Sequence, residues 1–525
     1  MEIDSVNSIR LGAWNRTTSP CETRSCSSSS PSSLSQQPPC GTCCLERTAE
    51  VPVATSETIA PIAPRNRYAG FSSIFWLWAG GNVLLTNFVS GSSYALGLRF
   101  WPMLVITVTG STLGLAFCAW DSQRGARYGL DEMVSLRPTF GARGSAYGVV
   151  VLVGVNFGWV GILASMAGSA MSLVAKGIGS GSTIPGNYTV YALSVGIALP
   201  LAIVMFSQKA AFRLSKITVP ILFVFVAYIL IRLAFGGYFA RIVAKPGDGS
   251  TNWTAAFEII VAFSISWFPY LGSWNRFANR ERTGFWGTYL GLASTGILFA
   301  AVGGMATLAT GQMDPAQWSS QLGLGPIALA VIVLGTVTSV THLLGSGSMG
   351  ILSAFPSLNY RWICLAVTIP SVIFVYADSL QKVFNLLLVF VGLLVGPYWA
   401  VALVDYFFLR GQRIDVRACY DPQGVYRFTG GFNLVAMGCT LVGMIVWLFL
   451  GGWLSGSSAL TFTAGKALFR YTSATLPSMV VAGALYFAAA RVLFAKRAMG
   501  GYPFSRTATP PQPAHETGLD SSATP

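Results

Sequence analysis

The sequence predicts an all-α integral membrane protein with twelve transmembrane helices, arranged as two inverted repeats of five in which helices 1 and 6 are broken. Three observations support this prediction. Of the 525 residues, 53% are hydrophobic and 10% are charged, whereas soluble domains carry about 25% charged residues. Apolar runs of about 20 residues, the length that crosses a bilayer, recur from Phe71 to Phe494. The first and the sixth of these runs contain helix-interrupting residues near their middle.

The apolar runs set the expected order of the spans, of which the ninth is the shortest. Two polar segments, rich in Ser, Thr and Pro, flank them at residues 1–66 and 498–525 and are expected to be disordered cytoplasmic tails around a transporter domain at 67–497. The spans are expected at about residues 71–96, 100–120, 146–173, 188–206, 217–235, 253–274, 285–308, 325–351, 362–376, 382–408, 430–452 and 472–494.

The positive charges predict the orientation. Fifteen Lys and Arg residues follow even-numbered spans and eight follow odd-numbered spans, and loops retained in the cytoplasm carry the excess of such residues. Both termini are therefore expected in the cytoplasm and the protein in the plasma membrane. The net charge of +14 is scattered between apolar segments, which argues against nucleic acid as a partner and leaves the lipid bilayer.

The first span is interrupted inside "FWLWAGGNVLLTNFVSG" at 75–91. Gly80 and Gly81 permit unwinding and close approach of a ligand to the backbone, and Asn82 offers an amide to a substrate or to the unwound chain. The alternative is a notch for packing against another helix, since small residues are common at membrane helix interfaces.

The sixth span is interrupted in "FSISWFPYLGSWNRF" at 263–277. Pro269 removes a helical hydrogen-bond donor, and Gly272 follows within one turn. The two breaks are five spans apart, so the corresponding helices run in opposite directions across the membrane. Inverted-repeat transporters place such broken helices around a site at the membrane midplane. Repeats are therefore expected at about 71–235 and 253–408, followed by two extra helices at about 430–494.

Four stretches give the chain a likeness to a known family. It resembles the nucleobase–cation symporter family, which includes purine–cytosine permeases, cytosine permease and the hydantoin and allantoin transporters. This resemblance implies a LeuT-like fold and a small-molecule substrate moved with a cation. The stretches are "FWLWAGGN" at 75–82, "RPTFGARGS" at 137–145, "SISWFPYLGSWNRF" at 264–277 and "GPYWAVALVDYFFLR" at 396–410.

A nucleobase site needs aromatic faces for stacking and a few polar groups for the edge of the ring. On the third span, Asn156 and Trp159 share a helical face because they are three residues apart. The resemblance assigns Asn156 to the edge of the base and Trp159 to its face. On the sixth span, Phe263 is expected to supply the second stacking face, although a different register would select Phe268.

The residues around the sixth break complete the expected substrate site. Groups freed by a helix break must find partners where lipid cannot reach, so Ser264, Ser266 and Trp267 are expected to face the substrate. Ser273 departs from the family, in which many members have Asp at this position, and this departure puts an inner gate built on that charge in doubt.

The cation remains open between sodium and a proton. On the eighth span, sodium-coupled relatives have two hydroxyl residues and Asn where this chain has Val340, Thr341 and His342. Val340 has no side-chain oxygen, which weakens a sodium site. An ionisable residue at membrane depth indicates function, so we expect proton coupling with His342 as the titrating group. Glu258 is the second candidate, and a neutral His342 that bonds a neighbouring helix is the alternative.

These features predict a secondary active transporter that imports a nucleobase or related heterocycle by cation symport. The alternatives are a permease for hydantoin, allantoin or an amino acid on the same fold, and a nutrient receptor that binds without transporting. An enzyme is not expected, because the few carboxylates and the one histidine of the spans form no catalytic pattern. No cofactor or metal site is expected either, since "CGTCC" at 40–44 has no second Cys or His pair.

Overall fold

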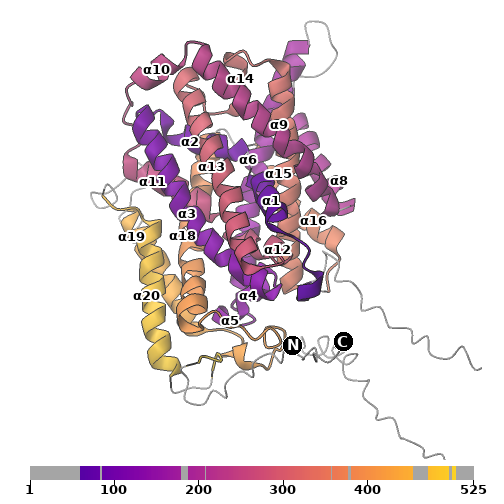
Figure 1. Ribbon diagram of the computed structural model, residues 1–525, viewed down its shortest axis with the longest axis vertical. Coiled ribbons are helices and arrows are strands. Elements are labelled where there is room, and N and C mark those ends of the chain that lie inside the picture. The colour runs from indigo at the N-terminus through magenta and orange to yellow at the C-terminus, as the bar shows by residue number, and fades with distance from the viewer. Residues whose placement is uncertain are drawn as a thin grey trace, which may run out of the picture. The chain divides into compact units, whose positions relative to one another are not determined.

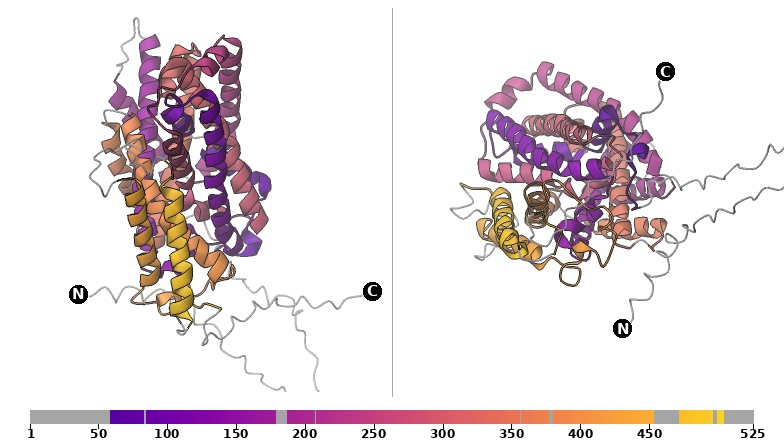
Figure 2. Two further views of the ribbon diagram at one scale, coloured as in Figure 1. Left: turned by 90° about the vertical axis from the view of Figure 1, so that its left-hand side faces the viewer. Right: turned by 60° about the horizontal axis from the view of Figure 1, so that its bottom comes forward.

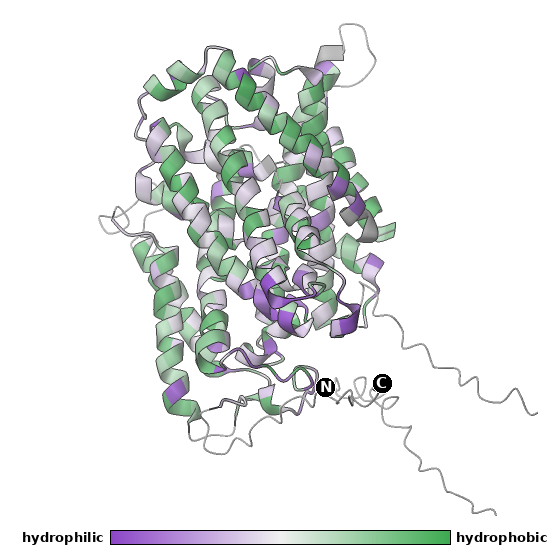
Figure 3. Ribbon diagram, in the orientation of Figure 1, coloured by the Kyte–Doolittle hydropathy of each residue, from purple (hydrophilic) through white to green (hydrophobic). Residues whose placement is uncertain are grey.

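The computed structural model describes residues 59–82, 85–178, 187–206, 208–355, 357–376, 380–452, 471–495 and 499–503. Within these ranges the regular elements are helices. Two isolated β-bridges also occur, one between Ala69 and Ala278 and one between Thr429 and Phe432. The hydrophobic residues are spread along the helix surfaces, and hydrophilic residues gather toward the end of the bundle where α4 and α12 lie (Figure 3). This all-helical architecture is the predicted fold class.

In the described part of the chain, nine helical segments are long and apolar enough to cross a membrane, and they follow the expected spans closely. Six of them are single helices, and three contain a 3₁₀ or π-helical stretch. The single helices are α3 (Phe100–Tyr128), α6 (Ala146–Ile178), α9 (Gln208–Phe235), α13 (Glu281–Thr310), α15 (Gly325–Ala354) and α20 (Thr475–Phe494). The composite segments are α7 (Tyr188–Tyr191) with η3 (Ala192–Ala198) and α8 (Leu199–Phe206), α11 (Trp253–Ile265) with η4 (Phe268–Tyr270) and α12 (Leu271–Asn275), and α18 (Leu380–Val404) with η6 (Asp405–Leu409).

The other expected spans are shorter or divided. The first comprises α1 (Phe71–Asn82) and α2 (Leu85–Ala95), and residues 83 and 84, where the predicted break would continue, lie outside the described ranges. The ninth and the eleventh are shorter apolar segments. They are α16 (Tyr360–Thr368) with η5 (Ile369–Ser371) and α17 (Val372–Val375), and α19 (Leu434–Leu450). Short helices in the connections are η2 (Pro64–Asn66), α4 (Glu132–Ser135), α5 (Arg137–Phe140), α10 (Phe239–Ala244), α14 (Pro315–Gln321) and η7 (Val425–Arg427).

The helices pack in two groups, each of which combines helices from both halves of the chain (Figure 1). In one group, α13 runs along α1, α2 and α3, and α3 also packs on α11 and α12. In the other group, α6 packs on α15 and η3, and α15 packs on α8 and α16. The first two helices of each repeat therefore lie together, as do the third and fourth. The last two helices, α19 and α20, pack beside α18 (Figure 2).

Glycines allow α2 and α13 to approach at backbone distance. A Cβ added to Gly91 would stand 1.8 Å from the carbonyl oxygen of Ala300, and one added to Gly303 would stand 2.2 Å from that of Phe88. Side chains larger than hydrogen cannot fit at this separation. The small residue Gly91 therefore does serve packing, about three turns beyond the Gly-Gly pair.

The packed domain extends past the expected tail boundaries on both sides. Ile62 is buried and its backbone N–H donates to Gly129 over 3.0 Å. At the other end, Tyr502 is buried and its hydroxyl donates to Asp405 over 2.8 Å. The prediction that the disordered tails reach residue 66 and begin at residue 498 is therefore wrong for residues 59–66 and 499–503. Single apolar and aromatic side chains attach these two segments to the packed domain. Residues 1–58 and 504–525 lie outside the described part of the chain.

The close contact between α2 and α13 predicts that replacing Gly91 lowers the free energy of unfolding much more than replacing Gly438. Gly91→Ala should lower the free energy of unfolding by about 1–3 kcal/mol, because the added methyl group must displace backbone atoms. Gly438→Ala on α19 is the matched control, since a Cβ there meets no atom within 4 Å. Thermal unfolding of the two purified variants checks this, and equal melting temperatures would contradict the packing.

Candidate functional site

The two helix breaks meet in the middle of the protein. The indole N–H of Trp267, just beyond α11, donates to the side-chain oxygen of Asn82 at the end of α1 over 3.0 Å. The ring of Trp267 also stands edge-to-face against Trp78 of α1, with centroids 5.7 Å apart. The sequence expectation that helices 1 and 6 are interrupted at one place therefore matches the geometry.

The side chain of Asn82 forms hydrogen bonds with other residues of the protein and is not among the lining residues of either cavity. Its amide nitrogen donates to the Leu292 carbonyl over 2.6 Å and to the Thr295 hydroxyl over 3.1 Å, both on α13. The amide of Asn87 in α2 donates to both the backbone and the side-chain oxygen of Asn82. Of the two roles expected for Asn82, the geometry shows the contact with the interrupted chain.

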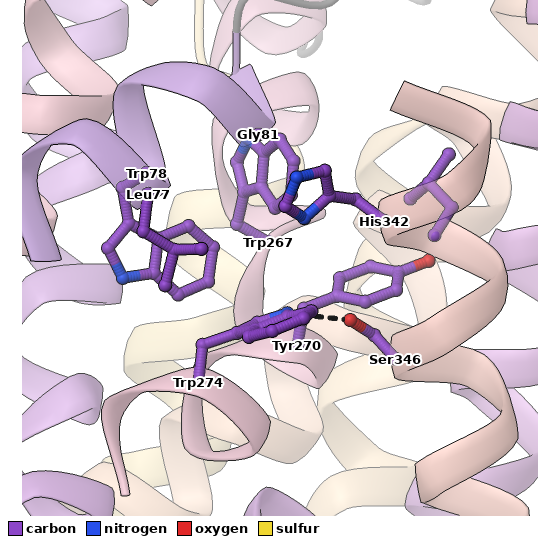
Figure 4. Close-up of a pocket in the computed structure, with 9 residues that line it drawn as sticks. Leu77, Trp78, Gly81, Trp267, Tyr270, Trp274, His342 and Ser346 are labelled. Atoms are coloured by element: carbon purple, nitrogen blue, oxygen red, sulfur yellow. Dashed lines mark hydrogen bonds between the residues drawn. The ribbon is translucent and has the colours of Figure 1, made fainter. Parts of the chain in front are cut away.

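A small cavity lies between the breaks and α15 (Figure 4). Gly81 opens onto it, since a Cβ at this position would meet only Trp267, at 3.9 Å. Gly80 is buried in α1 and is not among the lining residues. The lining is formed by Leu77, Trp78, Gly81, Trp267, Tyr270, Trp274, His342, Leu343 and Ser346.

A second cavity shares part of that lining and adds residues of α6 and α11. Each cavity has a volume of about 10 Å³, which is about the room needed by one water molecule. The shared residues, Trp267, Tyr270 and Leu343, therefore divide one contiguous site into two small spaces. The second space is lined by Trp159, Phe263, Ser266, Trp267, Tyr270 and Leu343.

Three aromatic rings close the second space. Trp159 of α6 stands edge-to-face against Phe263 of α11, with centroids 5.3 Å apart and an interplanar angle of 83°. Phe384 of α18 contacts both rings, at 5.9 Å from Trp159 and 6.2 Å from Phe263. In this arrangement the two expected stacking rings touch each other, so a flat ligand would have to separate them.

The structure distinguishes the two phenylalanines that the sequence left open. Phe263 lines the cavity, whereas Phe268 in η4 stacks on Trp399 of α18 with centroids 5.8 Å apart. The serines satisfy the backbone near the break, since Ser264 donates to the Ile260 carbonyl over 2.8 Å and Ser266 donates to the Phe263 carbonyl over 2.6 Å. Of the two serines, only Ser266 is among the lining residues.

Asn156 is not among the lining residues of either cavity, but it is bonded to Tyr270, which lines both. The side-chain oxygen of Asn156 accepts a hydrogen bond of 3.5 Å from the Tyr270 hydroxyl. Its amide nitrogen is buried without a hydrogen-bond partner in the described residues and lies beside Gly347 of α15. A buried amide donor that lacks a partner is costly, so Asn156 retains capacity to bind a group that enters this region.

The candidate cation residues are in different places. His342 lines the first cavity and faces Trp274, with ring centroids 5.4 Å apart. Thr341 is buried and donates to the Val337 carbonyl within α15 over 2.7 Å. Glu258 of α11 is remote from both cavity linings and caps the start of α20.

The capping by Glu258 is extensive. Its carboxylate accepts from the backbone N–H of Ala474 over 3.0 Å and from that of Thr475 over 3.1 Å, and also from the Thr475 hydroxyl. A negative charge at a helix N-terminus is stabilising. The contacts of Glu258 therefore attach the last helix to the second repeat.

Sequence reasoning missed several lining residues that lie next to predicted ones. Tyr270 and Trp274 follow Pro269 in the interrupted sixth span, and Ser346 is four residues after His342, which places both on one face of α15. The Trp274 indole N–H donates to the Ser346 hydroxyl over 2.7 Å (Figure 4). This helical spacing was the available signal for Ser346, whereas Phe384 of the tenth span shares no spacing pattern with a predicted site residue.

Carboxylates of α4 and of the residue before it bond the segment after the sixth-span break at one end of the site. Glu132 accepts from the backbone N–H of Gly272 and from the Trp399 indole N–H, each over 3.0 Å. The Ser273 hydroxyl donates to Asp131 over 2.8 Å. Ser273 therefore takes part in a contact at this end of the site although it lacks the charge common in the resembled family.

Comparison with known proteins agrees with this arrangement. A family described as permeases for cytosine/purines, uracil, thiamine and allantoin matches residues 61–473. The purine-uracil permease NCS1 of Arabidopsis thaliana is 24% identical over 475 residues, covering 83% of this chain and 78% of the relative. The allantoin permease of Bacillus subtilis is 22% identical over 433 residues, covering 75% and 86%.

Solved structures share the fold. Mhp1, a nucleobase-cation-symport-1 family transporter in a closed conformation with bromovinylhydantoin bound, has a TM-score of 0.69 and 17% identity, covering 86% of this chain and 97% of its own. A Na⁺-coupled sialic acid symporter has a TM-score of 0.56 and 12% identity, covering 84% and 93%. At these identities the likeness supports the LeuT-like architecture and says nothing about the ligand.

The aromatic cavity predicts that Trp159→Ala weakens binding of a flat heterocycle. The apparent affinity should fall several-fold, because contact with an aromatic ring contributes about 0.5–1.5 kcal/mol beyond area burial. Equilibrium binding of cytosine, uracil, allantoin and hydantoin to the purified variant measures this. Trp286→Ala is the control, because Trp286 on α13 is 49% exposed. Equal affinities in the two variants would remove Trp159 from the site.

Proposed function

We propose that this chain, which belongs to the family of permeases for cytosine/purines, uracil, thiamine and allantoin, imports a nucleobase or a related heterocycle by cation symport. Membership of this family makes it a transporter rather than an enzyme. The observation that supports the substrate class is the aromatic cavity at the meeting point of the two broken helices. Broken helices around a central site are the arrangement by which inverted-repeat transporters hold a substrate.

The side chains of the site have the chemistry that a flat heterocycle requires. Trp159 and Phe263 can face the two sides of a ring once they separate, and Ser266, Ser346 and the amide of Asn156 can bond its edge. The described lining of both cavities includes no Lys or Arg. A substrate that carries a carboxylate, such as an amino acid, would therefore find no permanently charged cationic side chain there.

Allantoin or hydantoin is the second candidate substrate class. One observation favours it, namely the match to an allantoin permease. These compounds offer N–H donors and carbonyl acceptors on one ring, as nucleobases do. The same cavity can therefore hold either class, and the balance of hydrogen bonds at the ring edge would select between them.

Competition for uptake tests the substrate class. Cells that express the chain should accumulate radiolabelled cytosine or uracil, and a panel of purines, pyrimidines, hydantoin and allantoin should compete while amino acids do not. Competition by amino acids alone would contradict the proposal. Binding of a panel compound without accumulation in vesicles would instead identify a nutrient receptor.

We propose in addition that the chain lies in the plasma membrane with both termini in the cytoplasm, and that the transported cation is a proton. The excess of Lys and Arg after even-numbered spans supports this orientation. The position of His342 on the lining of the central cavity supports the choice of cation, because histidine changes charge near neutral pH and would do so beside the substrate.

Proton coupling predicts that uptake into vesicles of purified protein follows an inward proton gradient without sodium. His342→Asn should flatten the pH dependence of this uptake, because asparagine retains hydrogen-bonding capacity but does not titrate. His515→Asn is the matched control, since the chain has two histidines and His515 is far from the spans in sequence. Strict sodium dependence with a pH profile indifferent to His342→Asn would contradict the proposal, as would equal effects of the two substitutions.

A further inference from the structure

A third cavity of about 260 Å³ lies between α6, α7, α14, α17 and α18. In the proposed orientation this is the outer side, since α6 ends there and α14 connects α13 to α15 (Figure 1). Its lining mixes polar, aromatic and apolar side chains. They are Ile162, Ser165, Met166, Ser169, Tyr188, Asp314, Gln317, Phe374, Leu380 and Val383.

This outer cavity stands directly outward of the closed aromatic rings. Ile162 follows Trp159 by one turn on the same face of α6, and Ser165 and Ser169 continue that face. From the other side, Val383 immediately precedes Phe384, whose ring contacts Trp159. The rings of Trp159 and Phe384 therefore separate the outer cavity from the central one, and a solute that leaves the first would meet the second.

Asp314 is the charged group of this lining, and its carboxylate is held in place. One oxygen accepts from the Ser169 hydroxyl over 2.6 Å, and the other caps α14 by accepting from the Ala316 N–H over 2.9 Å. A carboxylate offers about four lone-pair positions, so these two bonds leave it able to accept from a ligand. Gln317, one turn away on α14, adds an exposed amide that can donate and accept.

We propose that the outer cavity is a second binding site for the transported heterocycle, occupied before the central site. The Asp314 carboxylate accepts from N–H groups of the ring, as acidic side chains accept from the amino group of cytosine, and the Gln317 amide pairs with an adjacent donor and acceptor, as glutamine pairs with adenine. Tyr188 and Phe374 supply ring faces. The volume lies just below the range for drug-sized ligands, which suits a solute of one or two rings.

This inference rests on the proposed function, and uptake kinetics test it. Asp314→Asn and Gln317→Leu should each raise the KM for the best-transported compound of the panel several-fold while leaving Vmax unchanged, because the central site is intact. Asparagine keeps the cap of α14, since it is as good an N-cap as aspartate. Gln321→Leu is the matched control, because Gln321 is exposed on the same helix and does not line the cavity.

The outcomes separate the second site from its alternatives. An unchanged KM in both variants would overturn the proposal. A changed dependence on sodium or on the proton gradient in Asp314→Asn, with KM unaltered, would identify a cation site and would also overturn it. A rise in KM shared by Gln321→Leu would show a structural effect of α14 and count against it.

Equilibrium binding distinguishes failure of the second site from failure of the proposed transport. Purified full-length Trp159→Ala should retain binding of radiolabelled cytosine at the outer cavity together with weakened binding at the central site, and adding Asp314→Asn should lower this residual binding further while adding Gln321→Leu should not. This measurement does not require transport. Wild-type protein that binds cytosine in this pattern but accumulates no panel compound would refute the import function and still support the outer site. Residual binding indifferent to Asp314→Asn would refute the site.

Discussion

An interrupted helix inside a membrane must satisfy the backbone groups that the interruption frees, because lipid offers them no partner. At the end of α1, the amide of Asn87 donates to the backbone carbonyl of Asn82. Asn82 donates to α13 and accepts from Asn87 across the gap and from Trp267 of the other broken helix. The position of Trp267, and with it the boundary between the two central cavities, therefore depends on Asn82. Gly81 next to it provides the space that a side chain would fill.

The central site lies between the two groups of helices rather than within one. Gly81, Phe263 and Trp267 belong to the group around α13, whereas Trp159 and Ser346 belong to the group of α6 and α15. The hydrogen bond from Trp274 to Ser346 and the contact between Trp159 and Phe263 join the groups. A relative movement of the groups would break these contacts and separate the rings together. Admission of a flat solute is thereby linked to movement of whole helices.

The sequence allowed the broken helices to be located, because Gly-Gly-Asn and Ser-Trp-Phe-Pro mark interruptions directly. It could not choose between Phe263 and Phe268, since the register of side chains is lost across a break, and only the packing of Phe268 on Trp399 decides it. Glu258 could not be judged either. Its partners Ala474 and Thr475 are more than two hundred residues away in sequence, and no local pattern predicts a contact over that separation. Asp314 carries no local signal either, since its partner Ser169 is 145 residues away in sequence.

The two ends of the site are closed by different physical means. Outward, the central cavity is covered by aromatic rings, and aromatic rings can turn aside with little loss of hydrogen bonding. Inward, Glu132 bonds Gly272, Trp399 and the buried Arg124, and separating buried charged groups from their partners is strongly destabilising unless water replaces them. Opening inward therefore has to hydrate this cluster, whereas opening outward does not. The barrier to release should for this reason lie at the inner cluster, and a ligand that reaches the outer cavity can exchange with the outside solution many times before it is committed to transport.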